Sequence, residues 1–446
     1  MPPTTLLSLP LEVLDHIVRF VALLRFDYSE SRRPRPSALH HLAYGVGNRT
    51  LRGLALPYFG REATTASWMT DVWGGGGERV DTRALVRALK QTGSWAKLHS
   101  SLTEDFAQSY PNVERIVLLI PLKRMPGLDG EYAKPAHCPG FASSSPAHRV
   151  KALEVRHALC EPSVPSTDAF PACFPNLESV NLFQCVDPYW FKAATEAPRV
   201  TTLSVTVAER GGIGVPALWP AGLWEKLVSL SLAVLPPDRE IKATPIKAYL
   251  DGLNLPPTST LRSLSLSTQL PTRFAVPPLS MRDVVTSTRS TFGQVPLTSL
   301  AIDEYASCAP ADLDELCSAF PTLIKLELGD RMIWKGSRAD FIHSLSPLFS
   351  LHTLSCRIFP ETPASLFRPS PSRSPSPSST AAVEEEDQYA SPASIALELA
   401  AALPRLAMVG FSGRQSQVEW FKVKRGTGEE PDEVESVERY SLELDR

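Results

Sequence analysis

The sequence lacks most of the features that mark a secreted protein or a membrane protein. Its seven cysteines form no Cys-x-x-Cys pair, and an odd number is not expected of a disulfide framework. No apolar run approaches the length of a membrane span, and Glu12, Asp15 and Arg19 interrupt the apolar N-terminus, so we expect no signal peptide. These absences predict free thiols in a reducing compartment, the cytoplasm or the nucleus.

Charge and catalytic motifs are equally scarce. A net charge of −3 gives no electrostatic reason to expect nucleic acid or a membrane as a partner. The four glycines at 74–77 lack the Gly-Lys-Ser/Thr ending of a phosphate loop. His137-Cys138 and His157-x-x-Cys160 are the best candidate metal ligands, but their spacing is not that of a zinc site. We therefore expect no enzyme activity, no cofactor and no metal.

What the sequence does contain is a recurring apolar pattern. In its clearest copy, Leu313, Leu316 and Phe320 recur at the spacing of one helix face, and Pro321 ends that helix. Leucines at 326 and 328 then alternate as in a half-buried strand. The strand part recurs ten times, beginning at Val113, Val150, Leu177, Val200, Leu227, Leu261, Leu297, Leu323, Leu351 and Leu406. The intervals straddle the period of leucine-rich repeats, about 20–29 residues, and the array is similar to the divergent repeats that often follow fungal F-boxes.

The positions between the buried strand residues are predicted to face the concave side of such an array. They are small and hydroxyl-rich in the middle repeats, as at Ser204, Ser231 and Ser265, and charged farther on, as at Lys325 and Glu327. Small side chains let the backbone or helix of a partner lie close, and charges at the end orient it. We expect an unknown target protein to bind along this trough. The alternative is that Ser and Thr tolerate crowding on a curved sheet and bind nothing.

The N-terminus carries a second resemblance. Residues 9–17, Leu-Pro-Leu-Glu-Val-Leu-Asp-His-Ile, resemble the Leu-Pro-x-Glu-hydrophobic-Leu-x-x-Ile start of an F-box, and residues 48–59 resemble the closing helix of fungal F-boxes. The resemblance implies a three-helix domain that binds a Skp-type adaptor, and through it a cullin. The implied adaptor-binding residues are Leu9, Pro10, Leu14, Ile17 and Val18. The alternative is an amphipathic helix that merely caps the repeats.

The expected fold class is an α/β repeat. An F-box-like helical domain (1–61) precedes a helical connector (62–109, with helices at 82–90 and 96–109) and an irregular leucine-rich-repeat solenoid (110–414). A Pro- and Ser-rich, acidic insertion (361–392) is expected to be disordered, and Ser394 to cap the helix that follows it. Strands at 417–424 and 434–444 are expected to form a C-terminal hairpin cap (415–446).

These expectations lead to one function and one alternative. The resemblance implies the substrate-recognition subunit of a cullin-type (SCF) ubiquitin ligase, which binds the adaptor through the F-box and a target protein through the repeats. The alternative is a leucine-rich-repeat interaction scaffold unrelated to ubiquitin.

Overall fold

The structure is a computed structural model. It describes residues 9–23, 54, 62–64, 88–91, 112–119, 123–124, 132–133, 148–156, 174–185, 196–208, 219, 221–235, 245–253, 255–256, 258–268, 279–304, 306–329, 331–357, 391–412, 418–425 and 431–437. They belong to two compact units, Met1–Val200 and Thr201–Arg446. Both units together give a mixed α/β fold rich in strands, and none of the helices in the described ranges is long and apolar enough to cross a membrane.

The described residues of the first unit include helix α1 (Leu11–Leu23) and a parallel sheet. The carbonyl oxygen of Pro10 accepts backbone hydrogen bonds from Val13 and Leu14, both at 3.1 Å, so the proline stands at the start of the helix, where its fixed φ is favourable. The strands of the sheet pair in chain order: β1 (Glu62–Thr64), β2 (Ala88–Gln91), β3 (Arg115–Leu119), β6 (Ala152–Arg156) and β7 (Ser179–Cys185). The short strands β4 (Lys123–Arg124) and β5 (Tyr132–Ala133) pair antiparallel.

Strands β1 and β2 lie within residues 62–109, where the sequence predicts a helical connector. The predicted helix at 82–90 is wrong at its end, because residues 88–90 belong to β2. This strand pairs with β3 in parallel register, from Ala88 opposite Arg115 to Gln91 opposite Leu118. Pairing with a neighbouring strand satisfies the backbone N–H and C=O groups and overrides the helix preference of Ala, Leu and Lys.

The second unit contains a longer sheet. Seven of its strands run parallel in chain order: β8 (Thr202–Ala208), β9 (Ser229–Leu235), β10 (Ser263–Thr268), β12 (Ser299–Asp303), β14 (Lys325–Leu328), β16 (Thr353–Arg357) and β17 (Met408–Ser412). Two antiparallel strands, β18 (Val418–Arg425) and β19 (Pro431–Val437), follow β17. This is the predicted hairpin, although residues 438–444 of its second strand lie outside the described residues.

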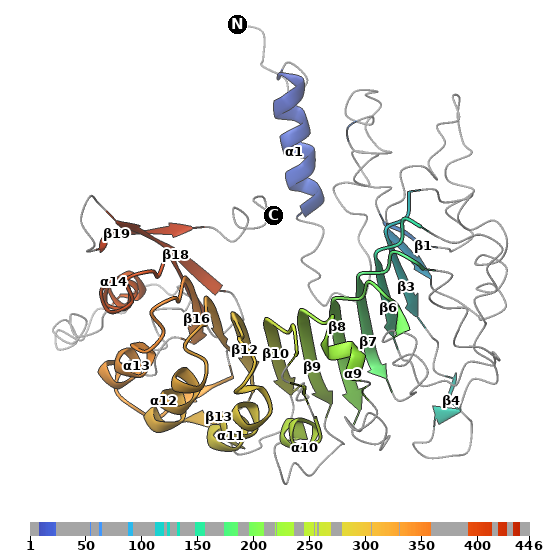
Figure 1. The fold of residues 1–446 in the computed structure, drawn as a ribbon. Helices are drawn as coiled ribbons and strands as arrows, with labels where there is room; N and C mark the ends of the chain where they lie inside the picture. Colours follow the sequence, from blue (N-terminus) through green and yellow to red (C-terminus); the bar gives the residue numbers. More distant parts are fainter. Residues whose placement is uncertain are drawn as a thin grey trace, which may run out of the picture. The chain divides into compact units, whose positions relative to one another are not determined.

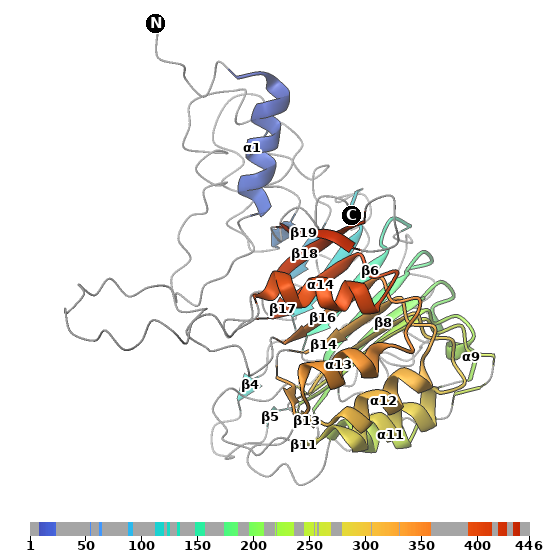
Figure 2. The ribbon, with the colours of Figure 1, turned by 90° about the vertical axis from the view of Figure 1, so that its left-hand side faces the viewer.

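Helices connect the parallel strands of the second unit. They are α9 (Ala221–Trp224), α10 (Pro245–Asp251), α11 (Met281–Phe292), α12 (Pro310–Ala319), α13 (Arg338–Leu345) and α14 (Pro392–Ala402). Helices α11 to α14 follow one another along one side of the sheet (Figures 1 and 2). A second, three-stranded parallel sheet is formed by β11 (Leu279–Ser280), β13 (Ala306–Cys308) and β15 (Ile333–Trp334).

All ten strands predicted from the apolar pattern are present, and each begins two residues after the first apolar position of its copy. Leu297, for example, precedes β12 at Ser299, and Leu323 precedes β14 at Lys325. In the second unit, one row of buried side chains crosses the strands in register: Leu203, Leu230, Leu264, Leu300, Leu326, Leu354 and Val409. Full burial of such a side chain contributes about 1.5–3 kcal/mol, so this row is a main source of the unit's stability.

The last helix begins earlier than the sequence predicts. The cap of α14 is Ser391, whose hydroxyl oxygen accepts a hydrogen bond from the backbone N–H of Ser394 at 3.1 Å, so the expectation that Ser394 is the cap is wrong. Pro392 occupies the first turn, where its missing N–H costs nothing. At the other end, the Arg425 guanidinium donates to the carbonyl oxygens of Ala400 and Leu403, both at 3.0 Å, and of Leu406 at 3.3 Å. A residue of β18 therefore closes the carboxyl end of α14.

Several predictions fall on residues that the structure does not describe. They are the second and third helices expected in the F-box-like domain (37–46 and 49–56, apart from Leu54), the helix at 96–109, the inserted segment from 361 to 390, and the candidate metal ligands at 137, 138, 157 and 160. They remain sequence predictions.

Candidate interaction face

The predicted target-binding residues lie on one face of the second unit's sheet. Pairing places Ser204 beside Ser231 and Ser231 beside Ser265. The same row continues through Ala301, Glu327, Ser355 and Gly410. Lys325 belongs to the adjacent row, with Thr202, Ser229, Ser263, Ser299, Thr353 and Met408. Neighbouring strands lie about 4.8 Å apart, so the small side chains of paired residues form a row that crosses several strands.

This face is the one turned away from the helices. Side chains alternate along each strand, and the leucines between the two rows are buried, as at Leu230 and Leu264, whereas Ser231 and Ser265 are half-buried. The described helices of the second unit lie on the other side of its sheet (Figures 1 and 2). We call these two rows, from β8 to β17, the open face.

The two predicted charges of the open face bind one another. The ammonium nitrogen of Lys325 lies 2.7 Å from a carboxylate oxygen of Glu327, two residues farther along β14. Both side chains are partly exposed, and pairs of this kind contribute about 1 kcal/mol or less to stability. The pair is therefore a polar feature of the surface and not a strong structural bond.

The sequence analysis missed the aromatic residue at the end of this face. Trp420 of β18 pairs in register with Gly410 of β17. A Cβ atom placed on Gly410 would lie 2.9 Å from the indole ring of Trp420 and 2.9 Å from a methyl group of Val418, so the ring lies directly over the glycine. The available signal in the sequence was Gly410 inside an apolar strand, because a glycine there often marks a place where another group lies close to the backbone.

A buried carboxyl group lies at the carboxyl ends of β10 and β12. Glu304 follows β12 directly and has no exposed surface. Its Oε1 atom accepts a hydrogen bond from the Thr268 hydroxyl at 2.8 Å, and the Arg331 guanidinium donates to the carbonyl oxygen of Thr268 at 2.9 Å. Burial raises the pKa of the Glu304 carboxyl to about 7. The group therefore titrates near neutral pH in the folded protein.

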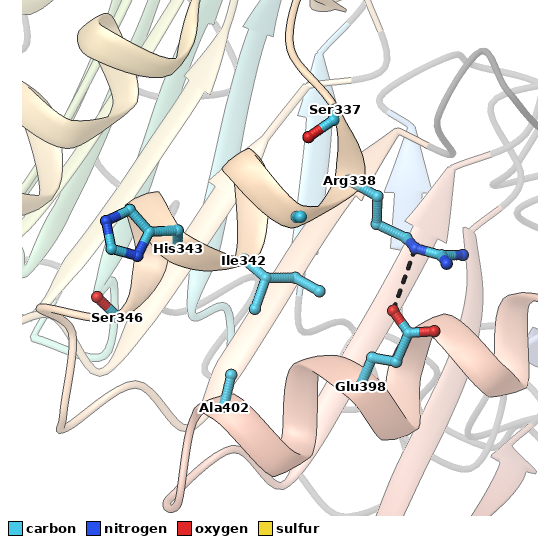
Figure 3. A pocket seen from close by; sticks show the side chains of 8 residues that line it. Ser337, Arg338, Ile342, His343, Ser346, Glu398 and Ala402 are labelled. Atoms are coloured by element: carbon cyan, nitrogen blue, oxygen red, sulfur yellow. Dashed lines mark ion pairs between the residues drawn. The ribbon is translucent and has the colours of Figure 1, made fainter.

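A groove of about 590 Å³ lies on the helical side, between α13 and α14 (Figure 3). Arg338 of α13 and Glu398 of α14 form an ion pair across it at 3.1 Å, and Ile342 of α13 contributes an apolar side chain (Figure 3). The other lining residues are Ser337, Ala339, His343, Ser346 and Ala402. The lining therefore combines an ion pair and a histidine with small polar and apolar side chains.

Three cysteines of the second unit are not suited to nucleophilic chemistry. Cys308, Cys317 and Cys356 are free and buried. Burial raises the pKa of the Cys308 and Cys356 thiols to about 12, so each remains protonated at neutral pH. Within the described ranges no three His, Cys, Asp or Glu side chains gather in a way that could hold a metal ion.

Helix α1 divides the implied adaptor-binding residues into two groups. Leu14 and Val18 are buried, with 3% and 0% of their surface exposed, whereas Leu9 and Ile17 are half-buried and Pro10 is exposed. The helix also exposes two large apolar side chains outside that set, Leu11 at 55% and Val13 at 43%. The sequence analysis singled out neither residue.

Comparison with known proteins gives little further information. No model of a known protein family matches the chain, and no curated protein matches it. Among solved structures, the fold is similar to that of the leucine-rich repeat-containing protein LegL7 from Legionella pneumophila, with a TM-score of 0.39 and 14% sequence identity. The similarity covers 80% of this chain and 92% of that one.

Proposed function

We propose that this protein is the substrate-recognition subunit of a cullin-type ubiquitin ligase. In this proposal the N-terminal segment docks on a Skp-type adaptor, which links it to the cullin, and the open face of a leucine-rich-repeat solenoid holds a target protein. The chain itself catalyses no bond formation. It raises the local concentration of target lysines near the conjugating enzyme, so that proximity favours transfer by the other subunits.

The observation that carries the target-binding part is the uninterrupted row of small side chains on the open face. Ser204, Ser231 and Ser265 stand side by side on three parallel strands, half-buried and on the side opposite the described helices of the second unit. A surface of this kind admits the backbone of another polypeptide at short distance. The Lys325–Glu327 pair farther along the face supplies polar groups that orient the partner.

The adaptor-binding part rests on the resemblance of residues 9–17 to an F-box and on the surface of α1. Leu11 and Val13 expose apolar area on a helix that also carries the exposed Glu12 and His16. Large apolar side chains in solvent at the start of a helix favour a binding role over a role in the protein's own core. They extend the implied contact set beyond Leu14 and Val18.

The first test is a pull-down of a purified Skp-type adaptor by the full chain. We expect binding by the wild type and at least a tenfold loss in a Leu11→Asp/Val13→Asp variant, because both changes place charge on exposed apolar positions. His16→Asp is the control, since it adds a negative charge at an exposed polar position of α1. Leu14→Asp/Ile17→Asp should also abolish binding, but with unfolding of the segment, because Leu14 is buried.

The second candidate function is an interaction scaffold without a link to ubiquitin. It is favoured if the folded wild type, checked by circular dichroism, does not retain the adaptor at all. In that outcome α1 is a capping helix, and the open face is the remaining candidate binding surface.

A further inference from the structure

The end of the open face at β17 and β18 differs chemically from its middle. Met408 and Gly410 of β17 pair with Lys422 and Trp420 of β18, respectively, so the four residues form a two-by-two block. Met408 and Trp420 are half-buried, and Lys422 is exposed. We call this block the aromatic end. It joins the rows of small residues directly, since Ser355 of β16 is the neighbour of Gly410.

Trp420 is held on the open side of the sheet. The alternate residue Phe421 is buried on the helical side, where its ring lies 5.8 Å from that of Phe411. Trp420 therefore projects to the opposite side, across Gly410. The absence of a side chain on Gly410 lets the indole lie close to the backbone of β17, which restricts its movement, and part of the side chain remains accessible. Fixed, partly exposed Trp side chains are typical anchors of protein interfaces.

Among the described residues, the ion pairs around the aromatic end involve Lys424 and not Lys422. Glu435 of β19 lies opposite Lys422, yet its carboxylate is 3.1 Å from the ammonium group of Lys424. Lys424 also binds Glu433 at 3.6 Å. Lys325, the other lysine in the row, binds Glu327. Charge complementarity thus favours an acidic group of a partner at Lys422.

We propose that the aromatic end binds a polypeptide segment in which a large apolar residue has an aspartate or glutamate within two positions of it. The apolar side chain packs on Trp420 and Met408, and the acidic side chain pairs with Lys422. The spacing follows from β18, where Trp420 and Lys422 are two residues apart on one face and therefore about 7 Å apart. This inference rests on the proposed function, because it names the chemistry of the target that the open face holds.

The test is a selection of random twelve-residue peptides, displayed on phage, against the purified full chain. We expect the retained peptides to share a large apolar residue with Asp or Glu within two positions. Trp420→Ala should weaken synthetic copies of these peptides at least tenfold in a fluorescence-polarisation titration. Binding should also weaken as salt is raised, because the pairing at Lys422 is exposed.

A charge exchange tests the pairing without disturbing the fold. With Lys422→Glu, the same selection should retain peptides that carry Lys or Arg in place of the acidic residue. Glu419→Lys is the matched control, because Glu419 is exposed on the same strand but alternates to the helical side. This control should leave both the selected motif and the affinity unchanged.

The inference is overturned if no peptide is retained or if the retained peptides lack the motif. It is also overturned if the peptides bind the Trp420→Ala and Lys422→Glu variants as tightly as the wild type. The proposed function is judged separately. If the retained peptides are instead lost on changing Ser204, Ser231 and Ser265 to Arg, the open face remains the target-binding surface although its aromatic end is not the anchor. Adaptor binding is measured independently of both.

Discussion

At the scale of single residues, Glu304 is the most unusual group in the described part of the chain. One carboxyl oxygen accepts a hydrogen bond from Thr268, and no hydrogen-bond partner of the other oxygen is found among the described residues. Burial is the main cause of its raised pKa, and the neighbouring Asp303 raises it further. The hydrogen bond from Thr268 and the positive charge of Arg331 act in the opposite direction. The neutral form is therefore favoured inside the fold.

The stability of the second unit should fall as pH rises from about 4.5 to about 7. The pKa of Glu304 is about 7 in the folded state and 4.5 when unperturbed, so the folded state holds a proton that the unfolded state releases. The contribution is fully present below pH 4.5 and is lost above pH 7, and it amounts to on the order of 3 kcal/mol. Urea unfolding at pH 5 and pH 8 measures it. Glu304→Gln should remove this difference, and the exposed control Glu419→Gln should retain it.

At the scale of elements, the helix caps show which features the local sequence predicts and which it does not. Ser337 and Asp340 cap α13 reciprocally: the serine hydroxyl oxygen accepts from the Asp340 N–H at 3.1 Å, and the Asp340 carboxylate accepts from the Ser337 N–H at 2.9 Å. The Ser337 hydroxyl also donates to the Asp340 carboxylate at 2.7 Å, and this bond together with the one from the Ser337 N–H lowers the pKa of the Asp340 carboxyl. The cap of α14 was misplaced because Ser391 and Ser394 are both good cap residues, and only the position of Pro392 in the first turn separates them.

Replacement of the cap serine should weaken α14 measurably. We expect Ser391→Ala to lower the free energy of unfolding by about 1 kcal/mol, because the N–H of Ser394 then loses its acceptor. Ser394→Ala is the matched control and should change stability by less than about half that amount, since its backbone N–H is the group used. Equal effects of the two changes would mean that the helix begins elsewhere.

At the scale of the whole molecule, the apolar pattern predicted the strands well because each copy repeats the same burial. Leu264, Leu300 and Leu326 lie side by side in the core, so a periodic sequence is enough to place them. The sequence did not predict contacts between residues far apart in the chain. The indole of Trp420 over Gly410 depends on the antiparallel turn from β17 to β18, and the strand at 88–91 exists through its pairing with β3.

The C-terminal hairpin should stabilise the end of the second unit. Deletion of residues 418–446 removes the Arg425 bonds to α14 and the Phe421 ring beside Phe411, and it exposes the edge of β17. We expect faster hydrogen exchange in α14 but not in α11, together with association of the protein on size-exclusion chromatography. Arg425→Ala in the full chain should speed exchange at the carboxyl end of α14 without causing association. Unchanged exchange in both proteins would show that the hairpin has no stabilising role.

The position of Arg425 also bears on the order in which the chain acquires its fold during synthesis. Helix α14 is synthesised before β18. Its last carbonyl groups therefore lack their hydrogen-bond donor, the Arg425 guanidinium, until β18 has been synthesised. Until then water solvates these groups, and the carboxyl end of the helix frays. The final repeat therefore matures only when the last strands have been translated, so a ribosome that pauses just before Arg425 would hold a nascent protein with an unfinished end.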